Sequence, residues 1–405
     1  MRRRAYLGSL AGLGSALGLA GCTGLSGGGD GDESPSGTGS TPPGTAQSGA
    51  TQRGVTAPED VSLPVPESAL HRSAGKDAIP AIVDPAFGPD WTDVSYDIHF
   101  RDGTSERYEP ELSTDDEVLG VVDGDTVRAY PLTLLRWHEV VNDTLSKPML
   151  VTFCPICQSG VVADRTVDGT PATFGVSGLL WHADLVMYDD ETESLWSQLL
   201  ATAIRGPRTG RTLDLHPVSR TTWAEWRERH PATEVLLPPP LSGTVVGEVR
   251  YNYDIDIAGR QNELAEQFPE LGSFGQDTWT DTRLRRRTMV LGVAANGEAR
   301  AYPRQQIEWD GPIHETVGGL PVVVTLSADG SMVAWDRRID GEAHTFEPVD
   351  DAHLLADGSR WHRLTGEAVD GPHEGEMLVS ATDTSTMFWF AWLTFHPETT
   401  VYGRE

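Results

Sequence analysis

The chain has 405 residues, enough for two or three average domains, and 38% of them are hydrophobic, which excludes a largely disordered protein. Sixty acidic residues against 31 basic ones give a net charge of −29, so nucleic acid would be repelled and is not expected as a partner. Only Lys76 and Lys147 are lysines, and this acidic, lysine-poor composition resembles that of halophilic proteins, whose surface acids are solvated.

The amino terminus is typical of an export signal. Residues 2–4 are arginines, and an uncharged stretch rich in Gly, Ala and Leu follows and ends in Leu19-Ala20-Gly21-Cys22. The arginines resemble a twin-arginine signal, and the last four residues resemble the lipobox at which lipoproteins are cleaved and acylated. We therefore predict a twin-arginine-type signal with a lipobox over residues 1–22, lipidation of Cys22, and an extracytoplasmic protein that contacts the cell membrane through its lipid anchor.

Residues 23–54 contain little except Gly, Ser, Thr, Pro and Asp. Such a composition buries too little apolar surface to offset the entropy lost on ordering, so this segment is predicted to be a disordered linker. After residue 22 no run of 18 or more apolar residues occurs, and membrane contact is therefore expected only at the amino terminus. Residues 55–114 are interpreted as an N-terminal extension of the folded part.

The remaining chain contains an internal repeat. The segment from Val118-Leu119-Gly120-Val121 to Arg128-Ala129-Tyr130-Pro131 is matched by Val290-Leu291-Gly292-Val293 to Arg300-Ala301-Tyr302-Pro303. The match continues to His230-Pro231 and His396-Pro397. We predict one copy over residues 115–237, a connecting segment over 238–287 and a second copy over 288–405.

Strands are predicted to dominate each copy. In the first copy, the turn signal Asp123-Gly124-Asp125 indicates a hairpin within residues 118–130, and a short helix is predicted from Pro131 to about residue 143. Further strands are predicted over 149–154, 160–165, 171–175, 185–188 and 195–198, and a threonine-capped helix over 221–230. The predicted fold class is α+β and β-rich, with two tandem related repeats packed as one pseudo-symmetric globular unit.

Residues found in only one copy are candidates for chemistry, because residues common to both are more simply explained as scaffold. His138 is opposite Asp310, Cys154 is opposite Leu326 or Ser327, and Cys157 is opposite Asp329. The segment Trp181-His182-Ala183-Asp184 has no counterpart. The candidate site is thus expected in the first copy, with the second copy supporting it and carrying no site.

If Cys22 is lipidated, Cys154 and Cys157 are the remaining cysteines, and their C-x-x-C spacing suits two chemistries. Two thiolates can bind a metal ion, with His138 and His182 as the further ligands and zinc or copper as the ion. The same pair can act in thiol–disulfide exchange, which would make the protein an extracytoplasmic oxidoreductase that needs neither histidine. Alternatively, the cysteines form an inert disulfide in a non-catalytic binding module, and His138 is a buried residue with satisfied hydrogen bonds.

Several segments resemble the family catalogued as domain of unknown function 3179 (DUF3179). They are Lys76-Asp77-Ala78-Ile79-Pro80, Asp84-Pro85-Ala86-Phe87, Arg128-Ala129-Tyr130-Pro131, Trp137-His138-Glu139-Val140-Val141-Asn142-Asp143, Thr152-Phe153-Cys154-Pro155-Ile156-Cys157, Phe174-Gly175-Val176-Ser177-Gly178-Leu179, Asp184-Leu185-Val186-Met187-Tyr188-Asp189 and Ser194-Leu195-Trp196-Ser197-Gln198. The resemblance extends over about residues 70–400 and implies no settled activity. One departure is Gln158, which stands where the family pattern has a glycine.

Overall fold

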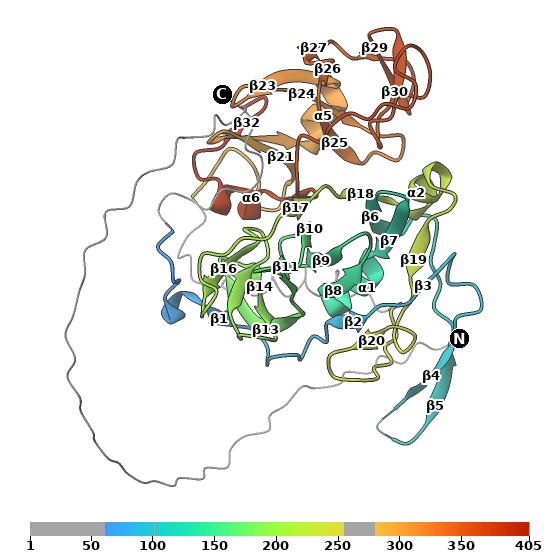
Figure 1. The fold of residues 1–405 in the computed structure, drawn as a ribbon, viewed down its shortest axis with the longest axis vertical. Helices are drawn as coiled ribbons and strands as arrows, with labels where there is room; N and C mark the ends of the chain where they lie inside the picture. Colours follow the sequence, from blue (N-terminus) through green and yellow to red (C-terminus); the bar gives the residue numbers. More distant parts are fainter. Residues whose placement is uncertain (1–60, 101, 255–279, 405) are drawn as a thin grey trace, which may run out of the picture. The chain divides into compact units, whose positions relative to one another are not determined.

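The computed structural model describes residues 61–100, 102–254 and 280–404, in which strands dominate and the helices are short (Figure 1). This confirms the predicted β-rich α+β class. The predicted signal (1–22) and linker (23–54), with part of the connecting segment, lie outside the described residues. No helix within the described ranges is long and apolar enough to cross a membrane.

Residues 61–254, here called the first region, contain three larger sheets. One has the order β18-β6-β7-β19-β3, formed by Ser219–Thr222, Glu117–Asp123, Thr126–Pro131, Glu234–Leu236 and Phe87–Gly88. The next has the order β17-β10-β9-β8-β2-β20, formed by Leu215–His216, Ser159–Asp164, Pro148–Cys154, Val140–Thr144, Ile82–Asp84 and Gly243–Thr244. The third has the order β1-β13-β14-β15-β16, formed by His71–Arg72, Phe174–Trp181, Asp184–Asp189, Leu195–Ser197 and Thr202–Arg205. Two strand pairs complete this region, β4 (Tyr96–His99) with β5 (Ser105–Tyr108) and β11 (Thr166–Val167) with β12 (Thr170–Pro171).

Residues 280–404, here called the second region, contain smaller sheets. The order β31-β21-β22-β32 joins Met387–Phe388, Met289–Ala295, Glu298–Pro303 and Thr400–Val401. The order β23-β24-β25 joins Ile313–Val317, Leu320–Leu326 and Met332–Asp336, and the order β28-β29-β30 joins Glu347–Pro348, His353–Ala356 and Ser359–His362. The strands β26 (Arg338–Ile339) and β27 (Glu342–Ala343) form a pair.

The helices are single short segments placed between strands. They are α1 (Leu132–His138), α2 (Trp223–Arg229), α5 (Arg304–Asp310) and α6 (Trp389–Phe395), with a 3-10 turn η1 at Glu67–Ala69. As predicted, a threonine caps α2: the Thr222 side chain accepts a hydrogen bond from the amide of Glu225 at 3.3 Å.

The first predicted helix is shorter than expected. It ends at His138, because Glu139 has a φ of 58° and residues 140–144 continue as strand β8 beside β9. Val140 and Val141 are β-branched and fully buried, and such residues fit a pleated sheet better than a helix. The predicted strand at 171–175 is likewise divided between β12 and the longer β13.

Two stretches have the same order of elements. A hairpin, a short helix and three antiparallel strands follow one another in β6-β7-α1-β8-β9-β10 and in β21-β22-α5-β23-β24-β25. In each hairpin a glycine lies under a tryptophan ring: a Cβ at Gly120 would lie 2.4 Å from Trp226, and one at Gly292 would lie 2.1 Å from Trp392. Only glycine leaves room for such a close approach.

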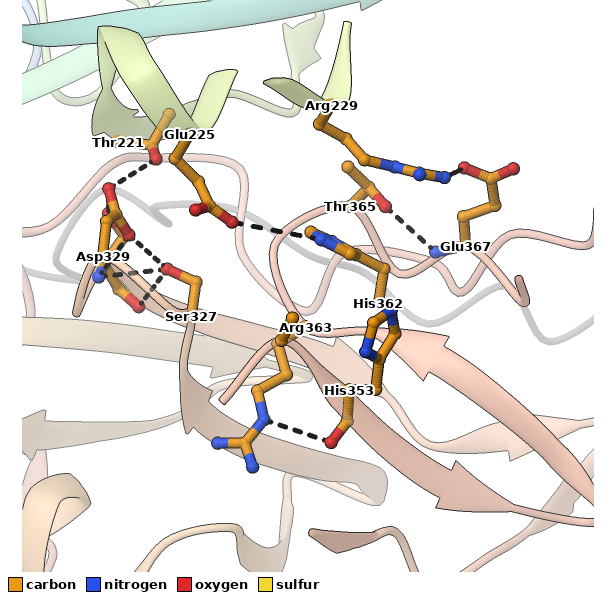
Figure 2. A network of polar contacts seen from close by, with 12 residues as sticks. Thr221, Glu225, Arg229, Ser327, Asp329, His353, His362, Arg363, Thr365 and Glu367 are labelled. Carbon is orange, nitrogen blue, oxygen red and sulfur yellow. Dashed lines mark hydrogen bonds and ion pairs between the residues drawn. The ribbon is translucent and has the colours of Figure 1, made fainter. Parts of the chain in front are cut away.

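The two regions contact each other through the start of α2 and the loop after β24 (Figure 2). The Asp329 carboxylate accepts hydrogen bonds from the Thr221 hydroxyl at 2.7 Å and from the Thr222 amide at 2.8 Å. Further along α2, Glu225 lies 4.0 Å from the His362 ring nitrogen, and Arg229 pairs with Glu367. The helix is therefore attached to the second region by charged groups along its length.

Candidate functional site

Cys154 is the last residue of strand β9, and Cys157 lies within the four-residue hairpin loop (155–158) that follows it. Strand β9 ends at Cys154, β10 begins at Ser159, and these two residues pair across the hairpin. The amide of Cys157 donates a hydrogen bond to the Cys154 sulfur at 3.4 Å. Cys154 is 1% exposed and Cys157 is fully buried, and both are free thiols. The hairpin thus holds two thiols next to each other and away from solvent.

Gln158 follows the second cysteine and stands where the family pattern has a glycine. Gln158 has a φ of 56°, in the left-handed region that favours glycine. Its side-chain amide donates to the carbonyl of Pro155 at 2.8 Å, a bond within the loop that glycine could not make. The loop keeps the backbone shape that a glycine would give, at some cost in strain.

A second hairpin turn covers the sulfurs. His182 and Ala183 join β13 to β14 in a two-residue turn, and both have positive φ, at 53° and 68°. Such turns match the twist of the strands but usually contain Asn or Gly. The Ala183 carbonyl oxygen lies 3.7 Å from the Cys154 sulfur and 3.1 Å from the Cys157 sulfur. The turn formed by His182 and Ala183 therefore brings an oxygen to both thiols.

Two buried acids lie near the thiols. Glu139 is 8% exposed, its carboxylate has no hydrogen-bond or ion-pair partner among the described residues, and burial raises its pKa to about 8. Asp184 is fully buried, and burial raises its pKa to about 7 despite hydrogen bonds from the Ser197 hydroxyl at 2.5 Å and the Leu199 amide at 3.3 Å. Burial, the Cys154 thiol and these two acids together raise the pKa of Cys157 well above its usual range.

His138 does not join this group. Its Nδ1 lies 2.7 Å from the carbonyl oxygen of Pro80 and its Nε2 lies 2.8 Å from the Tyr253 hydroxyl, so both ring nitrogens are engaged. The ring stacks on Tyr251, and burial lowers its pKa to about 4. A metal ligand must offer a free nitrogen lone pair. His138 matches the alternative of a buried histidine with satisfied hydrogen bonds.

His182 is half-buried in the turn beside Trp181, whose ring centroid lies 5.0 Å from the imidazole, and burial lowers the pKa of His182. Among residues 61–100, 102–254 and 280–404 no group of three or more His, Cys, Asp and Glu side chains is arranged to hold a metal ion. The predicted convergence of Cys154, Cys157, His138 and His182 on one ion is therefore not found. Cys154 and Cys157 lie next to each other, but both ring nitrogens of His138 are hydrogen-bonded to other residues.

Replacing His138 by alanine should distinguish a structural role of this residue from a role as a metal ligand. We expect the free energy of unfolding to fall by about 2 kcal/mol, because a buried ring and two hydrogen bonds are lost and Tyr253 loses its partner. Chemical denaturation measures this loss, and metal analysis of the same variant should give the wild-type metal content. A metal content lowered by the His138 replacement in a folded variant would restore His138 as a ligand.

The second region contributes directly to the surroundings of the cysteines. The amide of Phe388 donates to the carbonyl of Cys157 at 2.9 Å. The Gly160 amide donates to the Ser385 hydroxyl at 2.6 Å, and the Ser385 amide donates back to Gly160 at 2.9 Å. One apolar cluster also combines both cysteines with Trp389 and Trp392 of α6. The cysteine hairpin is thus packed between the two regions.

Glu139 and Asp184 were missed as site residues because isolated acids in so acidic a chain are expected on the surface. The comparison of the two predicted copies contained the signal: Glu139 is opposite Gly311, and Asp184 belongs to the segment without a counterpart. Both acids are therefore found in only one of the two predicted copies, which is the criterion that selected the cysteines.

Neither the curated proteins nor the solved structures include a match to this chain. One protein family does match, under the description "Protein of unknown function (DUF3179)", over residues 76–399. This range contains both cysteines, the turn that covers them and the residues of the second region that pack against them. The chain belongs to the DUF3179 family.

Proposed function

We propose that Cys154 and Cys157 form a buried two-thiolate site for a soft metal ion, with Cu(I) as the ion that fits best. The observation that carries the proposal is the approach of both sulfurs to one point beside the Ala183 carbonyl, at 3.7 and 3.1 Å. Thiolates prefer soft ions such as Cu(I), and Cu(I) is stable with two sulfur ligands. Zinc normally takes four ligands, and the described residues do not supply a third His, Cys, Asp or Glu.

The environment of the thiols supports an ion held out of reach of solvent. Two free thiols that bind one Cu(I) release two protons, so binding takes the place of the bonds from the sulfurs to Ala183. Glu139 and Asp184 oppose ionisation of the thiols in the absence of a cation, since buried acids repel further negative charge. The amide of Cys157 offers a hydrogen bond to a negative Cys154 sulfur.

The proposed setting is outside the cell. Residues 1–22 would direct export by the twin-arginine route, which carries folded proteins, and Cys22 would carry the lipid anchor. Because the cysteines are buried, an ion would be loaded as the protein folds and before it crosses the membrane. Residues 23–54 would then serve as the tether of the folded part.

We also infer that residues 115–237 and 288–405 are related copies. Support comes from matching contacts: Asn142 Oδ1 accepts from the amide of Phe174 at 2.7 Å, and His314 Nε2 accepts from the amide of Phe346 at 2.9 Å. The indole of Trp226 donates to Thr233, and that of Trp392 donates to Thr399. The site residues belong to the first copy alone.

One observation favours a second function, thiol–disulfide exchange. The carboxylate of Glu139, which has no partner within the described part of the chain, contributes to the raised pKa of Cys157 and is suited to accept a thiol proton. In that reaction the two thiols would lose two electrons and two protons to an acceptor disulfide, which would be reduced to two thiols. Burial and the raised pKa of Cys157 both slow such an exchange, so the metal site is preferred.

Metal analysis and thiol titration of the purified protein test the proposal. We expect one Cu(I) per chain for the wild type under anaerobic conditions, and none for Cys154→Ser or Cys157→Ser, because one thiolate cannot hold the ion tightly. Ser327→Ala, at the corresponding loop of the second region, is the matched control and should keep the ion. A reversible disulfide without bound metal would favour the exchange function, and an unreactive disulfide would favour a binding module with a structural crosslink.

A further inference from the structure

The second region places Arg286 next to the segment that is hydrogen-bonded to the cysteine loop. Arg286 lies just before β21, and its carbonyl accepts a hydrogen bond from the amide of Phe390 at 3.0 Å. Its guanidinium carbon lies 4.9 Å from the centroid of the Phe390 ring. Phe388, two residues before Phe390, donates its backbone amide hydrogen to the carbonyl of Cys157. The segment 388–390 thus joins Arg286 to the loop that carries the thiols.

The charge of Arg286 has no acidic partner within the described residues, and its Nε is buried without a hydrogen bond. Burial and Arg287 lower the pKa of Arg286, and the Cys157 sulfur acts in the opposite direction. Arg220, which donates to the carbonyl of Gln158 at 2.9 Å, differs: it is neutralised by Glu117, whose carboxylate lies 2.8 Å from its Nε. A half-buried guanidinium without an ion-pair partner is stabilised when a negative group occupies its neighbourhood.

We infer that Arg286 determines the ion specificity of the cysteine site by favouring a monovalent over a divalent ion. This inference rests on the proposed metal-binding function. When two thiols exchange two protons for one Cu(I), the site gains one negative charge, which a nearby guanidinium stabilises. When the same thiols take up one Zn(II), the charge of the site does not change, and the guanidinium gives no advantage. The second region therefore selects the ion and does more than support the first.

The test compares Cu(I) and Zn(II) affinities, each measured by competition with a chromophoric chelator, in the full-length protein. Arg286→Gln should weaken Cu(I) binding by roughly tenfold or more and leave Zn(II) binding unchanged, since a charge interaction in a partly buried site has about this size. Arg286→Lys should restore most of the Cu(I) affinity. Arg285→Gln, which removes an exposed charge one position away, should change neither affinity.

The outcomes separate the two proposals. If the wild type binds Cu(I) and Arg286→Gln leaves the ratio of the two affinities unchanged, the role of Arg286 is wrong and the cysteine site remains. An equal loss of both affinities would mean that Arg286 only maintains the fold around the hairpin. If the wild type binds no Cu(I), the site and its specificity both fail. Circular dichroism of each variant checks that the fold is intact.

Discussion

Replacing Glu139 by glutamine should stabilise the metal-free protein at neutral and alkaline pH. The folded state raises the pKa of this carboxyl from an ordinary value near 4.5 to about 8, because the side chain is buried. Between these two values the unfolded chain carries the charge and the folded protein does not, so rising pH favours unfolding. Glutamine has nearly the same shape and no charge to bury, and it removes this cost.

The expected gain depends on pH in a defined way. Below about pH 4.5 the carboxyl is protonated in both states, and the variant should match the wild type in free energy of unfolding. The gain in the free energy of unfolding should grow as pH rises and level off near pH 8. The difference between the unfolded pKa of 4.5 and the folded pKa of about 8 corresponds to a gain of about 3–5 kcal/mol. Chemical denaturation at pH 4, 6 and 8 measures it.

Glu234→Gln serves as the control, because this carboxylate on β19 is 54% exposed and its removal should change little at any pH. Asp184 also has a raised pKa and makes the wild type less stable as pH rises, but it is present in both proteins and cancels in the difference. A gain that is the same at pH 4 and pH 8 would show that the Glu139 carboxyl is not held neutral by burial.

Replacing Asp329 by alanine should destabilise the protein by about 2–4 kcal/mol at neutral pH. The carboxylate accepts hydrogen bonds from Thr221, Thr222, Ser327 and Ser331 in the contact between the two regions (Figure 2). Removing it leaves several donors without an acceptor, including the amide of Thr222 at the start of α2. Thermal or chemical unfolding of the variant measures the loss.

The contribution of the Asp329 carboxylate to the free energy of unfolding should disappear in acid. Burial would raise the pKa of Asp329, but the hydrogen bonds from Ser327, Thr222, Thr221 and Ser331 outweigh it and lower the pKa to about 2. A lowered pKa stabilises the folded state above the ordinary value of 3.8, and this stability is lost as pH falls toward 2. The difference between wild type and variant should therefore shrink below about pH 4.

Asp340→Asn is the matched control, since this exposed turn residue carries the same charge and should leave stability within about 0.5 kcal/mol of the wild type. If Asp329→Ala were as stable as this control, the contact between α2 and the second region would not contribute to the fold. A destabilisation that persisted unchanged at pH 2.5 would mean that the loss comes from packing and not from the carboxylate.

The sequence determined much of the first region correctly, because those elements are encoded locally. The hairpin around Asp123-Gly124-Asp125, the strands that end at Cys154 and begin near Gly160, and the threonine cap of α2 each follow from turn residues or from a short apolar run. The comparison of the two predicted copies also selected the cysteines and the turn that covers them. These signals need no knowledge of distant contacts.

The partners of each site residue were decided by the tertiary structure alone. His138 follows a plausible helix pattern, but Pro80 and Tyr253, 58 and 115 positions away, take its two nitrogens. Glu139 caps the end of α1, and strand β8 begins at Val140 where the sequence pattern predicts that the helix continues; the Glu139 side chain is buried there. Arg286 lies more than a hundred positions from Cys157 in the sequence, and the hydrogen bonds of Phe390 in α6 and Phe388 in β31 link the two. Contacts between residues so far apart depend on how whole sheets pack, and no local pattern of residues encodes that packing.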